Sequence, residues 1–197
     1  MNERVANVSM GEQTAIDEAG RALQKGHDLL QSGAHDQALA EFSRAEEMYG
    51  DAGEGQRQAR ACTNKALVLV QLRRFEDALD GFRTALKLFE EGDEFIRVAE
   101  QYGNMGSVHR DLEQPDEALE NYAEALAIYE ELGLRERAAD QCTNIAYARF
   151  MKKEYGEALG WYRKALSLYS QTGSEEKAKL TAENVSRLAT ALEEPNE

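Results

Sequence analysis

The sequence predicts an all-α protein, an α-solenoid of four helix-turn-helix repeats followed by a C-terminal capping helix. Three observations support this fold class. An Ala-Leu pair recurs every 40 residues, at 38–39, 78–79, 118–119 and 158–159. Aromatic residues and further alanines follow each pair at the spacing of one helical face, and self-similarity at a fixed period is typical of repeat architectures. Only 2 prolines occur in 197 residues, so long helices are permitted.

Each repeat contains two apolar stripes, and each stripe indicates one amphipathic helix. In the second helix of the third repeat, the stripe lies at i, i+4, i+7 and i+11 and comprises Ala118, Tyr122, Ala125 and Tyr129. In the first helix of that repeat, it lies at i, i+3, i+4 and i+7 and comprises Tyr102, Met105, Gly106 and His109. Alanine replaces Gly106 in sister repeats, at Ala66 and Ala146. A small residue at this position indicates close helix–helix contact.

The stripes predict nine helices and no strand. The expected ranges are 12–32, 36–51, 56–72, 76–91, 94–112, 116–131, 135–152, 156–171 and 175–193. The repeats cover about 14–53, 54–93, 94–133 and 134–173, and the capping helix covers 175–193. We assign residues 12–194 to a single domain and expect residues 1–11 to form a disordered tail, because they match no repeat.

Turn residues divide these helices. Glycines stand where helices should end, and glycine is the favoured left-handed C-cap: Gly53, Gly92, Gly133 and Gly173. Asp93 and Ser174 follow two of them as expected N-caps of the next helix. Pro115 suits the first turn of its helix, where a missing backbone N–H does no harm.

These columns resemble the tetratricopeptide repeat family. The residues of the third repeat that match the family pattern are Tyr102, Met105, Gly106, Ala118, Tyr122 and Ala125. The family's first aromatic is replaced by Cys62 and Cys142, and its closing proline is absent. The second aromatic is replaced by Leu69, His109 and Arg149. The 40-residue period exceeds the usual one of about 34 and resembles the longer-repeat branch of kinesin light chains, LGN/Pins adaptors and bacterial peptide-sensing regulators. The resemblance implies a right-handed superhelix whose first helices line a concave groove.

Charge and composition exclude several function classes. Lys+Arg is 23 and Asp+Glu is 37, a net charge of −14, which argues against binding to nucleic acid or to anionic lipid. No apolar stretch is long enough to span a membrane, and the N-terminus lacks the apolar region of a signal peptide. The expected location is therefore the cytoplasm.

No residue set indicates catalysis, a cofactor or a metal, so we do not expect an enzyme. The sequence has no phosphate-binding loop and no converging nucleophile and base. His27 and His35 are separated by a turn, and His109 lies on a core stripe, so packing roles are favoured. Cys62 and Cys142 occupy equivalent positions two repeats apart, too distant for a disulfide, and are expected to be buried thiols.

The candidate site is the face of each first helix that the core does not use. Its residues are Asn64, Asn104, Asn144, Asn184, Arg60, Leu67, Gln71, Ser107, Asp111, Asp140, Tyr147, Met151 and Arg187. An asparagine amide can pair with both groups of a peptide bond, so the asparagine column predicts recognition of a peptide backbone. Groove asparagines act in this way in the longer-repeat relatives. Leu67 and Tyr147 suggest pockets for partner side chains. The alternative is that the asparagines brace neighbouring helices and that Leu67 and Tyr147 are packed.

The predicted function is a non-catalytic interaction module that binds a peptide or partner helix in the concave groove. The groove charges are mixed, so we expect a protein or peptide partner of basic or mixed charge. The family's Lys/Arg clamp for a C-terminal carboxylate is not reproduced. The alternative function is a self-associating structural or assembly scaffold.

Overall fold

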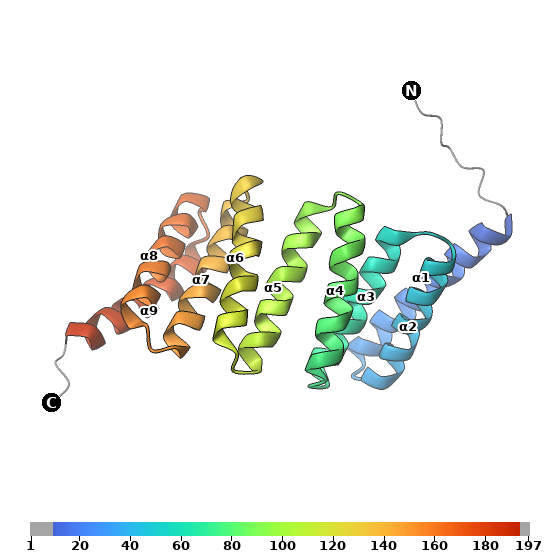
Figure 1. Cartoon of the computed structure of the whole chain (residues 1–197), viewed down its shortest axis with the longest axis horizontal. Coiled ribbons are helices and arrows are strands. Elements are labelled where there is room, and N and C mark those ends of the chain that lie inside the picture. The colour runs from blue at the N-terminus through green and yellow to red at the C-terminus, as the bar shows by residue number, and fades with distance from the viewer. Residues whose placement is uncertain (1–9, 194–197) are drawn as a thin grey trace, which may run out of the picture. The chain divides into compact units, whose positions relative to one another are not determined.

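The computed structural model describes residues 10–193 and places them in nine helices joined by short turns (Figure 1). The helices are α1 (Met10–Gln31), α2 (His35–Asp51), α3 (Gly55–Gln71), α4 (Phe75–Glu91), α5 (Phe95–Asp111), α6 (Pro115–Glu131), α7 (Arg135–Met151), α8 (Tyr155–Thr172) and α9 (Glu175–Glu193). No strand occurs among these residues. The prediction of an all-α helical repeat protein is confirmed, and each helix end lies within two residues of the expected position.

The chain forms two compact units, Met1–Glu94 and Phe95–Glu197, and each is described by itself. Within each unit, every helix packs against the next one along the chain. The assignment of residues 12–194 to a single domain stays a prediction, as does the handedness of the superhelix. The tail expected over residues 1–11 lies outside the described residues, except for Met10 and Gly11, which begin α1.

The turns between the helices recur at a regular spacing. Helices α2 to α7 are each 17 residues long, and three residues separate one helix from the next. One residue of each turn has a positive φ, and these recur every 20 residues: Gly33, Gly53, Arg73, Asp93, Glu113, Gly133, Lys153 and Gly173. The amide that follows donates to the carbonyl five residues before it, as Leu134 does to Tyr129 at 2.8 Å. This bond satisfies a carbonyl at the helix end.

Gly92 is the C-cap residue of α4, as expected, but the left-handed conformation expected there is wrong. Gly92 has a φ of −97°, and the next residue, Asp93, takes the left-handed conformation with a φ of 55°. Asp93 is therefore the turn residue and not an N-cap. The equal helix lengths set the left-handed position, and the glycine stands one residue before it. Gly53, Gly133 and Gly173 do take positive φ values, and Pro115 lies in the first turn of α6, as expected.

The core consists of the predicted alanine and aromatic columns. All sixteen residues at these positions are buried: Ala38, Phe42, Ala45, Tyr49, Ala78, Phe82, Ala85, Phe89, Ala118, Tyr122, Ala125, Tyr129, Ala158, Tyr162, Ala165 and Tyr169. Small residues let rings approach the facing helix closely. A Cβ added at Gly106 would lie 2.6 Å from Cε1 of Tyr122, and one added at Gly26 would lie 2.6 Å from Cε1 of Phe42.

Both cysteines are buried and free, which confirms that part of the prediction. Burial raises the pKa of Cys62 to about 12, with a contribution from nearby Glu46. Burial likewise raises the pKa of Cys142 to about 11. Both side chains are therefore uncharged thiols at neutral pH and contribute to the core as small apolar groups.

We predict that Gly106→Ala destabilises the protein by about 1–3 kcal/mol, because the new methyl group displaces the Tyr122 ring. Gly160→Ala is the matched control, since a Cβ at this exposed position of α8 meets nothing within 4 Å. It should stabilise by about 0.5–1 kcal/mol, the usual gain of alanine over glycine in a helix. Urea denaturation measures both changes. Stabilisation by both substitutions would contradict the close packing at Gly106.

Candidate functional site

Ion pairs join successive first helices of the second unit. Arg137 of α7 donates to the Glu100 carboxylate of α5 at 2.5 Å, and Arg97 reaches the same carboxylate at 2.7 Å. Lys177 of α9 bonds to Asp140 of α7 at 2.8 Å. The two acids occupy the same position in consecutive repeats, as do Arg137 and Lys177. These pairs form a row across α5, α7 and α9 that places the same face of the three helices side by side.

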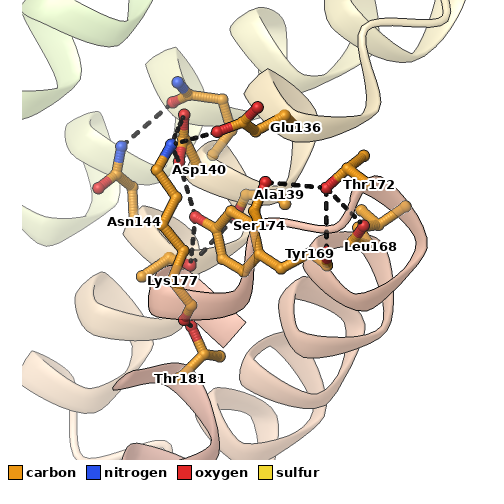
Figure 2. Close-up of polar contacts among 12 residues, drawn as sticks. Glu136, Ala139, Asp140, Asn144, Leu168, Tyr169, Thr172, Ser174, Lys177 and Thr181 are labelled. Carbon is orange, nitrogen blue, oxygen red and sulfur yellow. Dashed lines mark hydrogen bonds and ion pairs between the residues drawn. The ribbon is translucent and has the colours of Figure 1, made fainter. Parts of the chain in front are cut away.

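Asp140 bonds to side chains from two other helices, α8 and α9. Figure 2 shows Lys177 reaching from α9 to Asp140 and Glu136 on α7, at 2.8 and 3.0 Å. The Tyr169 hydroxyl of α8 donates to Asp140 at 2.7 Å, and the Lys177 ammonium lies 5.6 Å from the centre of the Tyr169 ring. Asp140 therefore joins three helices. The sequence analysis placed it among the groove residues without this structural role.

The ion pairs of the row shift the pKa of Glu100 and of Lys177. Burial alone would raise the pKa of Glu100, but hydrogen bonds from Arg137 and Arg97 outweigh burial and lower it. The hydrogen bond to Asp140 raises the pKa of Lys177, and Glu136 adds to this effect. The lowered pKa of Glu100 and the raised pKa of Lys177 both favour the charged form of the side chain at neutral pH.

The asparagines of the second unit lie one helical turn beyond this row. Asn104 and Asn144 follow Glu100 and Asp140 by four residues, and Asn184 occupies the same position in α9. All three side chains are half-buried. Within the described part of the chain, Asn104 and Asn184 make no hydrogen bond, and Asn144 makes a long one of 3.3 Å to Gln141 of its own helix. Their amides are therefore available on one shared face.

Asn64, in the first unit, differs from the other three. Its Nδ2 lies 3.3 Å from Nε2 of His27, which belongs to the preceding first helix. The His27 ring in turn packs edge-on against Phe42, with ring centroids 5.2 Å apart. Asn64 thus braces a neighbouring helix, which is the alternative that the sequence left open. On the same helix, Arg60 and Gln71 are exposed and Leu67 is 40% exposed.

Two further predicted residues of the second unit have partners within the unit. Ser107 accepts a hydrogen bond from the Tyr122 hydroxyl at 3.3 Å and donates to the carbonyl of Gly103 at 3.0 Å. Asp111 pairs with its sequence neighbour Arg110 at 2.8 Å. Met151 is half-buried near the end of α7. Among these residues, Ser107 helps to hold α5 against α6.

A cavity of about 370 Å³ lies among α7, α8 and α9. Its lining residues are Tyr147, Phe150, Tyr162, Asn184, Arg187, Leu188 and Ala191. Three of them, Tyr147, Asn184 and Arg187, were predicted site residues, and the structure brings them together. The sequence analysis missed Phe150. Its signal was an aromatic residue three positions after Tyr147, in a column that otherwise holds no aromatic residue: Leu30, Val70, Arg110 and Thr190.

Residues 10–193 contain no group of three or more histidine, cysteine, aspartate or glutamate side chains arranged to hold a metal ion. None of the helices in that range is both long enough and apolar enough to cross a bilayer.

Two family models, both described as tetratricopeptide repeat, match residues 23–93 and 97–171. Solved structures share the fold. The apo form of RapI is 18% identical with a TM-score of 0.76, covering 84% of this chain and 61% of RapI. Aspartyl phosphate phosphatase F from Bacillus subtilis is 14% identical with a TM-score of 0.76, covering 94% of this chain and 54% of the phosphatase.

A third structure, BtubC (BKLC) from P. vanneervenii, is 18% identical with a TM-score of 0.56, and the match covers 96% of this chain and 96% of BtubC. No curated protein matches the sequence. At these identities the structural similarity concerns the fold alone, and the chain spans only 61% and 54% of the first two relatives.

We predict that Glu100→Gln lowers the free energy of unfolding by about 0.5–1 kcal/mol at neutral pH, because Arg97 and Arg137 lose a partly exposed ionic partner. The folded-state pKa of Glu100 is lowered, so its contribution is present above the ordinary value of 4.5 and is lost as the pH falls through the folded-state value. The difference between wild type and variant should therefore shrink in acid. Urea denaturation at neutral and acidic pH measures it.

Glu120→Gln serves as the control, since Glu120 is exposed on α6 and makes no interaction within the described residues. A difference for Glu100→Gln that stays constant from neutral to acidic pH would contradict the prediction.

Proposed function

Since the chain belongs to the tetratricopeptide repeat family, we propose that it is a non-catalytic protein–protein interaction module that binds a peptide or partner helix through Asn104, Asn144 and Asn184. The supporting observation is that Asn104 and Asn184 are half-buried and unpaired within the described residues, on the face they share with Asn144. The polar atoms of these amides remain accessible to water, so a ligand gains affinity there where its N–H and C=O groups make hydrogen bonds better than those to water.

The proposed mechanism is recognition of backbone groups. Each asparagine offers one carbonyl oxygen and one NH₂ group, which complement the N–H and C=O groups of an extended chain. Packed helices are about 8–10 Å apart. Since an extended peptide rises about 3.3 Å per residue, one asparagine serves about every third residue. This spacing lets side chains of different kinds alternate between the anchored positions.

The ion-pair row prepares this face for binding. Arg137 and Lys177 fix α7 and α9 against the preceding first helices before any partner arrives. A face that is already ordered loses less conformational entropy on binding. The charges of the row are largely paired, so a partner of mixed charge suits the face, and the net charge of −14 attracts basic segments over longer distances.

The second candidate function is a self-associating scaffold. The observation that favours it is the apolar surface of α9, where Leu180 is 56% exposed and Leu192 is 46% exposed. A second copy covering these side chains would remove apolar area from water. Light scattering over a range of protein concentrations tests this function, and a strict monomer at high concentration rejects it.

We predict that Asn104→Ala combined with Asn144→Ala weakens the binding of peptides selected from a random phage-displayed library on the wild-type protein. Each lost pair of backbone hydrogen bonds should reduce affinity about tenfold. Fluorescence anisotropy of a labelled selected peptide measures the change.

Asn121→Ala is the matched control. Asn121 lies on the second helix α6, where its side chain donates to the carbonyl of Glu117, so this substitution should leave peptide affinity unchanged. Equal affinities for wild type and the Asn104/Asn144 double variant, with unchanged helical circular dichroism, would reject the asparagine mechanism.

A further inference from the structure

The cavity among α7, α8 and α9 has an apolar interior that is already formed. Tyr162 and Leu188 are 7% exposed and make its buried walls. Tyr147 and Phe150 stand at its opening, at 47% and 45% exposed. The Phe150 ring packs against Tyr155 with centroids 5.3 Å apart, and this contact holds it in place. The volume of about 370 Å³ falls within the range of sites that take small organic groups.

Besides the hydroxyl groups of Tyr147 and Tyr162, the polar side chains that line the cavity come from α9. Asn184 has no hydrogen bond within the described residues, and Arg187 lies one turn further along the same helix. The Arg187 side chain is 76% exposed, and its nearest acid, Glu183, lies 3.6 Å away. That contact is an exposed pair within one helix, which contributes little to stability. The guanidinium is therefore available to an incoming carboxylate.

We propose that this cavity binds one large apolar or aromatic side chain of a partner peptide that is directly adjacent to an aspartate or glutamate. The apolar side chain enters between Tyr147, Phe150 and Leu188. The neighbouring carboxylate pairs with Arg187, and Asn184 pairs with the backbone between the two residues. The proposal deepens the proposed function and rests on it, because Asn184 belongs to the same asparagine column.

An internal acidic side chain suits the cavity better than the carboxylate at the end of a chain. Arg187 is the one cation among the lining residues, and it lies at the solvent-exposed opening. The carboxylate at the end of a chain is part of the backbone. In the proposed pose the backbone lies beside Asn184, whose side chain carries no charge to pair with it. A carboxylate carried on a flexible side chain reaches the opening instead.

The test uses capped dipeptides as probes, so that it does not depend on peptide binding along α5. Acetyl-Phe-Glu-amide is titrated into the full-length protein and followed by ¹H–¹⁵N NMR. We expect shifts at the amides of Tyr147, Phe150 and Arg187, with a dissociation constant in the millimolar range. Acetyl-Phe-Gln-amide should bind about threefold more weakly, as expected for one exposed charge pair. Acetyl-Ala-Glu-amide should cause no comparable shifts.

Two variants assign these effects. Arg187→Gln should abolish the preference for Phe-Glu over Phe-Gln, and Tyr147→Ala should weaken binding of both dipeptides. Arg163→Gln is the matched control, because Arg163 is exposed on α8 outside the cavity. Its preference should equal that of the wild type. Since Tyr147 is 47% exposed and the Arg187 side chain is 76% exposed, circular dichroism should report an unchanged fold in both variants.

Several outcomes overturn the proposal: equal binding of the Phe-Glu and Ala-Glu probes, a preference that survives Arg187→Gln, shifts centred outside the cavity, or tighter binding of acetyl-phenylalanine with a free carboxylate. Failure of the asparagine mechanism is measured separately, by the Asn104/Asn144 double variant, whose substitutions lie outside the cavity lining.

Discussion

The close approach of aromatic rings to small residues on the facing helix is the contact on which the rest of the structure depends. Gly26 and Gly106 leave room for the rings of Phe42 and Tyr122, whereas Gly81 lies against another small residue, Ala66. Such contacts fix the rotation of each helix about its own axis, because a small rotation would make a ring clash with the backbone of the facing helix. Once that rotation is set, the opposite face of each first helix is set as well. Asn104 and Asn184 owe their shared orientation to packing in which their side chains take no part.

The ion-pair row adds a second constraint, this time along the repeats. Each bond from Arg137 or Lys177 crosses from one first helix to the acid of the preceding one. Asp140 also receives the Tyr169 hydroxyl, so a single carboxylate holds side chains from α8 and α9. A polar residue on an outward face can thus serve the scaffold. Exposure and polarity in the sequence do not separate such a residue from one that is available to a partner.

The sequence predicted the repeat columns and the helix bounds because these follow from local periodicity, and the same periodic pattern occurs in every repeat. It placed the left-handed residue of one turn at Gly92 and not at Asp93, since the position of this residue depends on the equal lengths of α4 and its neighbours. It also could not separate Asn64, which contacts His27, from Asn104 in the same column. That difference arises from the neighbouring helix, 37 residues away in sequence. The cavity beside Tyr147 also required three helices in space, and Phe150 draws attention only once Arg187 and Leu188 are placed opposite it.

The 20-residue spacing of the left-handed turn residues bears on how such a chain can grow or shrink in evolution. Inserting or deleting a single 20-residue segment preserves every turn but exchanges the roles of first and second helices downstream, so asparagines would move to the side now occupied by residues such as Asn121. A 40-residue segment preserves both the turns and the roles. Viable relatives should therefore differ in length by whole hairpins, and genetic duplication of one hairpin adds one asparagine to the column.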